Sequence, residues 1–293
     1  MTWAITGGSG QLGRSLAEKL TEKNQEFWSL DRRELDVSKQ DSIEKIVSIQ
    51  PKILINCAAW TDVELAELNF LQAKATNQSG ARNMALAAKY LKIPLVHLST
   101  DYVFSGFSDR AWTVNDVPEP RSRYGQSKLL GEREVQSIYP EGSTILRTAW
   151  LYGPYGTNFV KKIITKAIST DQPIRVVDDQ KGQPTSSFDL ATQIWEFVEL
   201  GLQPGIFHAT NAGKTSWWDF ACQVVRLLGQ PTDRVIAVPS SSYSSLVDRP
   251  YFSVLDHSEW SKVKMKPMRS WLSALEDIFP RILKSVKGEL ESV

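Results

Sequence analysis

The chain has 293 residues, of which 42% are hydrophobic and 23% are charged, and its formal net charge is +1 at pH 7. This length exceeds the usual size of one compact core, so we expect one large domain or two interlocked domains. The near-neutral charge, without a basic run, disfavours nucleic acid and anionic membranes as partners, and no apolar stretch approaches the roughly 20 residues of a membrane span.

The cysteines and histidines predict neither disulfides nor a metal site. Cys57 and Cys222 are too few for a disulfide framework. His97, His208 and His257 are scattered along the chain, so we expect structural roles for them. The N-terminus runs directly into an apolar strand pattern without a charged lead or signal core, which predicts a cytoplasmic enzyme.

The first half alternates short β-branched runs with amphipathic helical patterns, which predicts a parallel sheet covered by helices. The expected strands are Trp3–Thr6, Phe27–Leu30, Ile53–Asn56, Leu95–Ser99 and Thr144–Arg147. The expected helices are Gln11–Lys23, Asp41–Ile49, a long segment through Ala73–Leu91, and Gly125–Ile138. This alternation predicts a doubly wound α/β fold of the Rossmann type.

The pattern changes after residue 151, where shorter helices alternate with brief strands. The expected helices are Phe159–Ile168, Leu190–Leu200, Trp217–Leu228 and Ser270–Phe279, and the strands lie near Ile174–Val177, Ile206–Ala209 and Val235–Ala237. We therefore predict a first domain over 1–151, with a returning segment near 178–215, and a smaller α/β domain over 152–177 and 216–293. The serine-rich segment Pro239–Ser245 is either a loop beside a binding site or an inert surface loop.

A glycine-rich segment directly follows the first strand and opens the first helix. Gly7, Gly10 and Gly13 allow a tight turn, close backbone approach to a pyrophosphate, and close packing of helix on strand. The helix N-terminus offers free N–H groups and its positive dipole end to phosphates. Glycines that merely form a turn are the simpler alternative, but the position, the spacing and a second strand ending in an acid favour dinucleotide binding. The first domain is therefore the expected NAD(P)-binding domain.

The end of the second strand carries signals for both nicotinamide cofactors. Asp31 is placed to hydrogen-bond an adenosine ribose, which favours NADH. Arg32 and Arg33 can receive a 2′-phosphate, which favours NADPH, or they form a solvated loop. We therefore expect NADPH or NADH. Asp36-Val37 and Ala58-Ala59-Trp60-Thr61 follow strands at the carboxyl edge, where we expect them near the adenine and the nicotinamide ribose.

Tyr124 and Lys128 are four residues apart on an expected helix, so they lie one turn from each other on one face. An ammonium beside a phenol favours the phenolate and lowers a pKa that is normally about 10. Thr100 follows the fourth strand, and its hydroxyl can bond a substrate carbonyl or the phenol. This set predicts carbonyl reduction, with Tyr124 as proton donor. A Tyr and a Lys at this spacing are also a common pair on helix surfaces.

These residues lie in segments that resemble the extended short-chain dehydrogenase/reductase superfamily, and more closely its dTDP-4-dehydrorhamnose reductase family. The matching segments cover nearly the full chain: Gly7-Gly8-Ser9-Gly10-Gln11-Leu12-Gly13, 56–64, Ser99-Thr100-Asp101-Tyr102-Val103-Phe104, 124–132, 146–153, Asn158-Phe159-Val160, 179–185 and Arg249-Pro250. The end of the glycine loop and the block from Ser99 are specific to this family, and the other segments are common to the superfamily.

The resemblance implies that NAD(P)H reduces the C4 ketone of a dTDP-4-dehydro-6-deoxy sugar, giving dTDP-L-rhamnose in the best-known case. The implied cofactor contacts are Gly10, Gln11, Leu12, Asp36, Val37, Ala59, Trp60, Thr61, Tyr124 and Lys128. The implied sugar contacts are Thr100, Asp101 and Trp150, and we place Tyr124, Asn158 and Arg249 in the same substrate set. Trp150 either offers a flat apolar face to a sugar or fills the core, and Arg249 pairs either with the diphosphate or with a carboxylate of the chain.

The resemblance has limits. Some bacterial relatives dimerise through magnesium held by glutamates, one of them just after the glycine loop, where this chain has Arg14-Ser15. We therefore expect no such metal and retain a homodimer only as a hypothesis. Dehydratases and epimerases share the Tyr and Lys, but dehydratases carry an Asp-Glu pair after the Thr, and here Asp101 is followed by Tyr102. A regulatory subunit of methionine adenosyltransferase keeps much of the fold, so a non-catalytic NADP-binding subunit is another alternative.

Overall fold

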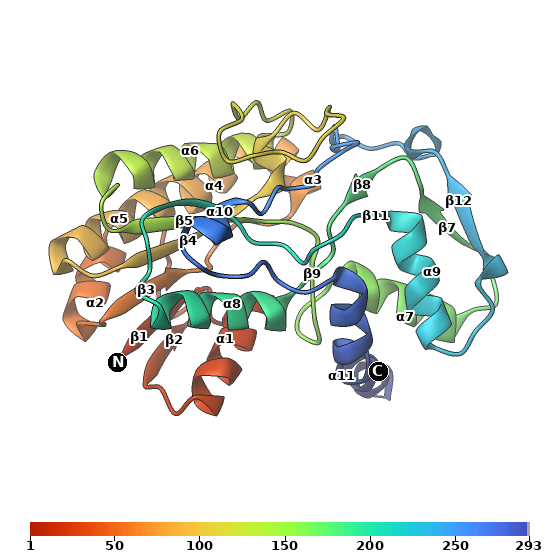
Figure 1. The fold of residues 1–293 in the computed structure, drawn as a ribbon, viewed down its shortest axis with the longest axis horizontal. Coiled ribbons are helices and arrows are strands. Elements are labelled where there is room, and N and C mark those ends of the chain that lie inside the picture. Colours follow the sequence, from red (N-terminus) through yellow and green to blue (C-terminus); the bar gives the residue numbers. More distant parts are fainter. Residues whose placement is uncertain (292–293) are drawn as a thin grey trace.

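The computed structural model describes residues 1–291, and a six-stranded parallel sheet forms the centre of its larger lobe (Figure 1). The strand order is β10-β5-β4-β3-β1-β2. The strands are β1 (Trp3–Thr6), β2 (Phe27–Leu30), β3 (Ile53–Asn56), β4 (Leu95–Thr100), β5 (Ser143–Thr148) and β10 (Gly205–His208). Every residue of β1, β3 and β4 is buried, as expected for strands covered on both faces.

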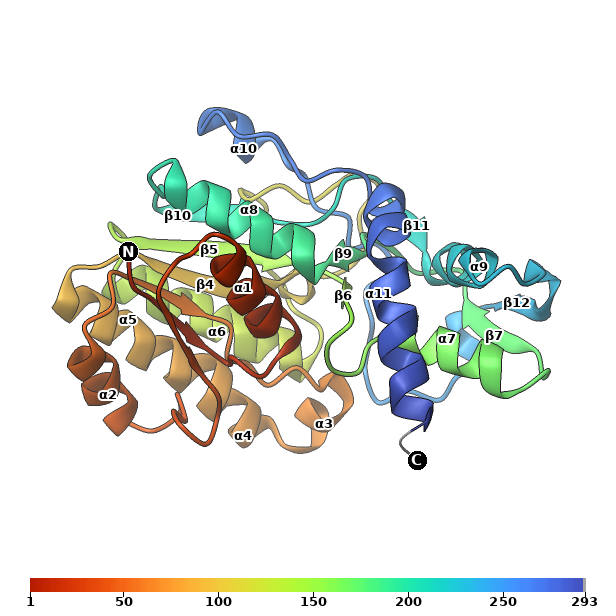
Figure 2. The same ribbon diagram turned by 90° about the horizontal axis from the view of Figure 1, so that it is seen from below.

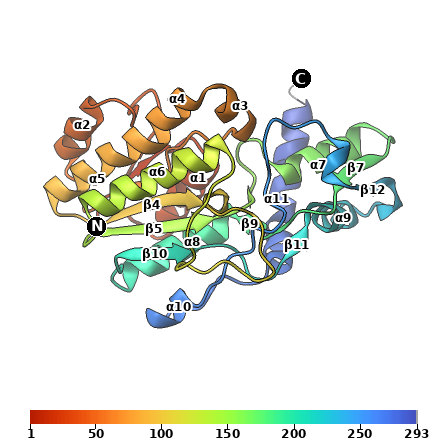
Figure 3. The ribbon, with the colours of Figure 1, turned by 90° about the horizontal axis from the view of Figure 1, so that it is seen from above.

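Helices cover both faces of this sheet, as Figures 2 and 3 show from opposite sides. One face carries α1 (Gln11–Glu22) and α8 (Ser187–Glu199), whose apolar side chains pack on the strands. The other face carries α2 (Asp41–Ile49), α5 (Gly80–Leu91) and α6 (Arg123–Ile138). The predicted doubly wound α/β fold is confirmed.

A smaller lobe lies beside the sheet (Figure 1). Its core forms among α7 (Phe159–Ser169), α9 (Trp217–Leu227), α11 (Trp271–Glu291) and the parallel pair β7 (Ile174–Val177) and β12 (Val235–Val238). Shorter elements complete the chain: β6 (Leu151–Tyr152) with β9 (Thr185–Ser186), β8 (Lys181–Gly182) with β11 (Thr215–Ser216), α10 (Glu259–Lys262), and the 3-10 turns η2 (Asp101–Val103), η3 (Thr232–Arg234) and η4 (Ser240–Ser242).

Two helical regions differ from the expectation. The segment before α5 contains α3 (Val63–Leu68), α4 (Phe70–Lys74) and a π-helical turn, η1 (Ala75–Ser79). The C-terminal helix, expected to end at Phe279, continues through Pro280 to Glu291. Ile282 and Val286 continue its buried apolar stripe beyond the proline, so packing on the smaller lobe outweighs the lost backbone donor.

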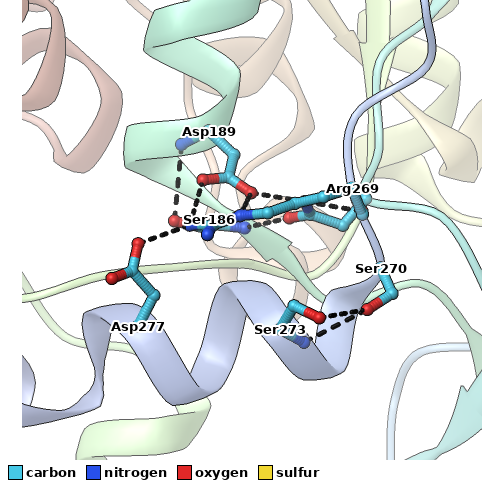
Figure 4. Close-up of polar contacts among 7 residues, drawn as sticks. Ser186, Asp189, Arg269, Ser270, Ser273 and Asp277 are labelled. Atoms are coloured by element: carbon cyan, nitrogen blue, oxygen red, sulfur yellow. Dashed lines mark hydrogen bonds and ion pairs between the residues drawn. The ribbon is translucent and has the colours of Figure 1, made fainter.

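Arg269, in the segment that leads into α11, links the two lobes (Figure 4). Its guanidinium donates to both carboxylate oxygens of Asp189 on α8 at 2.9 Å each, and to Asp277 Oδ2 on α11 at 2.7 Å. Asn211 donates to the same Asp189 at 2.7 Å. These bonds hold the C-terminal helix against a helix that covers the sheet.

The strand order places a topological switch point between β1 and β3. The chain leaves β1 to form β2 on one side and returns to form β3 on the other. Ligands of open α/β sheets bind outside the carboxyl ends of the strands at such a point. Within residues 1–291, no helix combines the length and the apolar character needed to cross a bilayer.

Candidate active site

The glycine loop at the end of β1 packs too tightly to admit side chains. Gly7 has φ +67°, and a Cβ on it would lie 2.7 Å from the backbone nitrogen of Ala58. A Cβ on Gly13 would lie 2.4 Å from the Gly7 carbonyl oxygen. Gly10 is the N-cap of α1 and offers no side-chain hydrogen bond to the N–H groups of the first turn. The loop and helix terminus therefore fit a pyrophosphate, which would bind these backbone donors.

The end of β2 carries one carboxylate that is already hydrogen-bonded to the backbone, and two exposed cations. Asp31 accepts from the backbone N–H groups of Glu34 at 3.0 Å and Arg33 at 2.7 Å, and these bonds hold its pKa below the ordinary value. The Arg32 and Arg33 side chains are 78% and 92% exposed, and Arg32 approaches Asp36 at 4.0 Å. Both sequence signals are thus present at one strand end: an acid placed for a ribose and cations open to a phosphate.

Asp36 and Val37 lie at the next turn of the chain. The Asp36 carboxylate accepts from the Ser38 N–H at 3.1 Å and hydroxyl at 2.7 Å. Burial alone would raise the pKa of Asp36, but the Ser38 bonds outweigh it and the pKa is lowered. Val37 is buried against Gly80, where a Cβ would lie 2.6 Å from it. Close packing of α5 therefore fixes this part of the expected adenine site.

Asn77 joins the loop after β3 to α6, a role that the sequence did not reveal. Its side chain accepts from the Trp60 N–H at 2.8 Å and donates to the Trp60 carbonyl at 3.1 Å. It also donates to the hydroxyl of Ser127, at 2.8 Å, and Ser127 lies between Tyr124 and Lys128 in α6. Asn77 lies in the π-helical turn η1, which carried no recognisable signal beyond an Asn inside a helical pattern. The loop Ala58-Ala59-Trp60-Thr61 is thereby fixed to α6, the helix of the expected reacting residues.

Thr100 and Tyr124 meet where β4 ends and α6 begins. Thr100 is the last residue of β4, and its hydroxyl donates to Asp101 Oδ1 at 3.0 Å. Tyr124 lies in the first turn of α6, which Ser122 caps by accepting from the Gly125 N–H at 3.1 Å. Burial raises the pKa of the Tyr124 phenol, and the neighbouring Thr100 hydroxyl opposes this only in part. The expected lowering of the Tyr124 pKa is therefore absent from this structure.

Lys128 contacts the backbone of β4. It is 2% exposed, and its ammonium donates to the Leu98 carbonyl at 2.5 Å. Burial lowers the pKa of Lys128 to about 8, while the nearby Glu132 carboxylate opposes the shift. Lys128 thus follows Tyr124 by one turn of α6, but its ammonium is held by the strand through the buried Leu98 carbonyl.

Asp101 and Tyr102 follow Thr100 in the 3-10 turn η2. Asp101 is 2% exposed, and burial raises the pKa of its carboxyl to about 6, with the Ser253 and Thr100 hydroxyls opposing. The Tyr102 ring meets Tyr124 edge to face at 5.5 Å between centroids. Burial raises the pKa of Tyr102 to about 12. The position next to Asp101 therefore carries a neutral phenol at neutral pH.

Arg249 forms an ion pair within the chain. It donates to Glu64 Oε1 on α3 at 2.7 Å and to the Tyr102 hydroxyl at 3.3 Å. Glu64 also accepts from Ser245 at 3.0 Å. Of the two sequence interpretations of Arg249, the structure contains the pairing with a carboxylate, which ties the segment before Arg249 to the larger lobe.

Trp150 packs face to face on Trp217, with 3.5 Å between ring centroids and 8° between planes. Its backbone has φ +45°, an unusual conformation for a large side chain. A Cβ on Gly182 would lie 2.5 Å from the indole. Stacking on Trp217 stabilises the strained backbone conformation of Trp150, and the glycine at residue 182 leaves room for its indole.

Asn158 connects the glycine loop to a cavity of about 1020 Å³ in the smaller lobe. Its side chain caps α7 and donates to Gln11 Oε1 at 3.0 Å. The cavity is also lined by Arg175, Tyr243 and Arg249. Among the expected substrate residues, Asn158 and Arg249 line this cavity, whereas Thr100, Asp101, Tyr124 and Trp150 do not.

Residues 1–291 contain no cluster of three or more His, Cys, Asp or Glu side chains arranged to hold a metal ion. The backbone donors at the end of β1 lie at the same edge of the doubly wound sheet as the start of α6, which carries Tyr124 and Lys128. This arrangement defines an NAD(P)-dependent oxidoreductase.

Comparison with known proteins identifies the family within this class. The family model described as the RmlD substrate binding domain matches residues 1–283. The chain belongs to this family, and the predicted resemblance to dTDP-4-dehydrorhamnose reductases is confirmed.

The relatives match over nearly their whole lengths. A dTDP-4-keto-6-deoxy-D-glucose reductase of Streptomyces niveus is 40% identical over 95% of this chain and 96% of its own. A dTDP-4-dehydrorhamnose reductase of Streptomyces griseus is 39% identical over 96% and 93%. The crystal structure of the dTDP-4-dehydrorhamnose reductase of Bacillus anthracis in complex with NADP has a TM-score of 0.91 at 35% identity, over 95% of this chain and 98% of that one.

Proposed function

We propose that the chain reduces the C4 ketone of a dTDP-4-dehydro-6-deoxy sugar with NADPH or NADH, and that it converts dTDP-4-dehydrorhamnose to dTDP-L-rhamnose. The observation that carries this proposal is the position of Thr100, Tyr124 and Lys128 at the same sheet edge as the glycine loop. The printed names of the relatives support a reductase of a nucleotide sugar and differ in the sugar itself.

The cofactor is held at the carboxyl edge of the sheet in this proposal. Gly7, Gly10, Gln11, Leu12 and Gly13 bind its phosphates through backbone and helix terminus. Its adenosine end lies by Asp31, Arg32, Asp36 and Val37, and its nicotinamide end by Ala58, Ala59, Trp60 and Thr61. When bound, the cofactor supplies a hydride to the carbonyl carbon.

The proton comes from Tyr124, whose hydroxyl donates to the oxygen of the substrate carbonyl. Thr100 hydrogen-bonds the same oxygen or the phenol and favours charge on the carbonyl oxygen. Lys128 stabilises the phenolate that forms. Asp101 and Trp150 contact the sugar, and Asn158 binds the nucleotide portion from the cavity of the smaller lobe. Arg249 lines the same cavity, and in this proposal it binds the diphosphate in addition to or in place of its pairing with Glu64.

The remaining assignments follow from the same proposal. Residues 1–151 with 178–215 form the NAD(P)-binding domain, and 152–177 with 216–293 form the substrate-binding domain. α8 and β10, which fall within 178–215, support this division because both pack with the main sheet. We also propose a cytoplasmic location and retain a homodimer as a hypothesis.

The test follows loss of NADPH or NADH absorbance with dTDP-4-dehydro-6-deoxy-L-mannose as substrate. Tyr124→Phe should lose at least about a hundredfold in turnover and still bind the cofactor, because it removes only the proton donor. Tyr90→Phe, at a tyrosine that is 73% exposed, is the matched control. Failure of the wild-type protein to consume either cofactor would overturn the proposal.

Two other functions predict different results in the same preparation. An epimerase or dehydratase retains its NAD, so an ultraviolet spectrum showing stoichiometric NAD in the purified protein would favour that class. A regulatory subunit binds NADPH tightly, shows no turnover and co-purifies with a partner.

A further inference from the structure

A fully buried ion pair lies one helical turn beyond Lys128, outside both expected binding sites. Arg147 on β5 donates to Glu132 on α6 twice, from Nε to Oε1 at 2.9 Å and from Nη2 to Oε2 at 2.6 Å. The two side chains are 2% and 1% exposed. Burying two charges costs much of the attraction between them, so such a pair is a weak source of stability. Its placement therefore points to an effect on its neighbours.

The pair connects the elements that carry the reacting residues. Glu132 follows Lys128 by four positions, so both side chains lie on the same face of α6. Ser99, which directly precedes Thr100, donates to Glu132 Oε1 at 2.5 Å. Ser99 and Arg147 are opposite each other in the β4–β5 register. Glu132 thus fastens α6 to two strand ends beside Thr100 through three hydrogen bonds.

The charge on Glu132 also acts on Lys128. The ionisable groups that face the ammonium are Cys57 after β3, His97 on β4 and Glu132 on α6, with Arg147 on β5 behind Glu132. Burial raises the pKa of Cys57 to about 12 and lowers the pKa of His97, so both are neutral at pH 7. Of these groups, Glu132 is the one that carries negative charge next to two buried cations.

We propose that Glu132, held by Arg147, is a positioning residue of the reacting site. It fixes α6 on the ends of β4 and β5, and it keeps the Lys128 ammonium charged at neutral pH. Glu132 acts through Lys128 and Thr100 without touching substrate or cofactor. This inference rests on the proposed function, because that function assigns Thr100, Tyr124 and Lys128 to the reaction.

Glu132→Gln and Glu132→Asp separate charge from position. Glu132→Gln keeps the shape and removes the charge, so Lys128 loses its proton at lower pH. In the pH profile of kcat/KM for NADPH, the midpoint of the fall at high pH (the alkaline limb) should shift to lower pH by about one unit or more. At pH 7.5, kcat should fall at least about tenfold. Glu132→Asp keeps the charge on a side chain that is one methylene shorter, so kcat should fall while the alkaline midpoint of the kcat/KM profile stays at its wild-type pH. Glu134→Gln, which removes an outer charge paired with Arg82, is the control.

An alkaline limb that stays in place in folded Glu132→Gln would overturn the inference. If that variant does not fold, the double variant Glu132→Leu, Arg147→Met replaces the pair by apolar groups, which a buried site tolerates. Its turnover should be at least about tenfold below wild type, and wild-type turnover would show a purely structural role.

If the wild-type protein has no turnover, the proposed function fails. The pH dependence of NADPH affinity, followed by fluorescence in wild type and Glu132→Gln, then decides the inference: its alkaline midpoint should move down in the variant, and an identical midpoint would overturn it.

Discussion

The buried carboxyl of Asp101 should cost the folded protein stability at neutral pH. Burial raises its pKa from the ordinary 3.8 to about 6. Because the folded-state pKa lies above the unfolded-state pKa, the native protein holds the Asp101 proton more tightly than the unfolded chain does. The stabilising effect of this proton is complete below pH 3.8 and is lost as the pH rises through 6.

The magnitude follows from the separation of the two pKa values. About two pH units correspond to about 3 kcal/mol, of which about 2 kcal/mol is lost between pH 4.5 and 7.5. Asp101→Asn cannot titrate, so its free energy of unfolding relative to wild type should rise by about 2 kcal/mol over that range. Any pH-independent cost of the new amide cancels when the two pH values are compared.

Urea unfolding of wild type and Asp101→Asn, followed by tryptophan fluorescence at pH 4.5, 6.0 and 7.5, measures this change. Asp116→Asn is the control, because its hydrogen bonds with Arg110 hold the Asp116 pKa below the ordinary value. The stability from Asp116 is lost only as the pH falls below 3.8, so that control should differ from wild type equally at pH 4.5 and 7.5. The same flat difference for Asp101→Asn would refute the reasoning.

Three further substitutions test local features of the structure. Gly7→Ala should destabilise the protein by more than about 2 kcal/mol in urea unfolding, because φ is positive and Ala58 is too close for a Cβ. Asn158→Ala should cost about 1 kcal/mol through the lost cap of α7, whereas Asn158→Ser should restore most of it. Arg269→Lys should lower the free energy of unfolding by about 1 kcal/mol, since it loses the paired bonds to the Asp189 carboxylate. This loss should be smaller at high salt, and the same loss at low and high salt would contradict the prediction.

The sequence predicted the main sheet because its strands are short apolar runs separated by recognisable helices. The bounds agree within a residue or two for β1 to β5, and β4 extends one residue further to include Thr100. The pairs β6–β9 and β8–β11 were not predicted, since two-residue strands contain no periodic pattern. Their pairing comes from contacts distant in sequence, which a local pattern does not record.

The same limit applies to the site. The glycine loop and the Tyr124–Lys128 spacing are local and were found, and the fold brings both to one sheet edge. Asn77 was missed because its partners, Trp60 and Ser127, belong to separate elements that meet only in the folded chain. The acceptor for Lys128 is likewise a backbone carbonyl of β4, and every strand offers such carbonyls. Which one accepts depends on how α6 is seated on the sheet.

The direction of the Tyr124 pKa bears on the direction of the reaction. A reductase needs a neutral phenol that gives up its proton as the carbonyl is reduced, whereas an enzyme that begins by oxidising a hydroxyl needs a phenolate base. Burial raises the pKa of Tyr124, so the resting protein holds the proton on the phenol. In the proposed reduction the proton then leaves the phenol, and Lys128, which follows Tyr124 by one turn of α6, would attract the phenolate only as that charge develops. In the proposed function, Lys128 would therefore act as the phenol gives up its proton, and it would not first ionise the phenol.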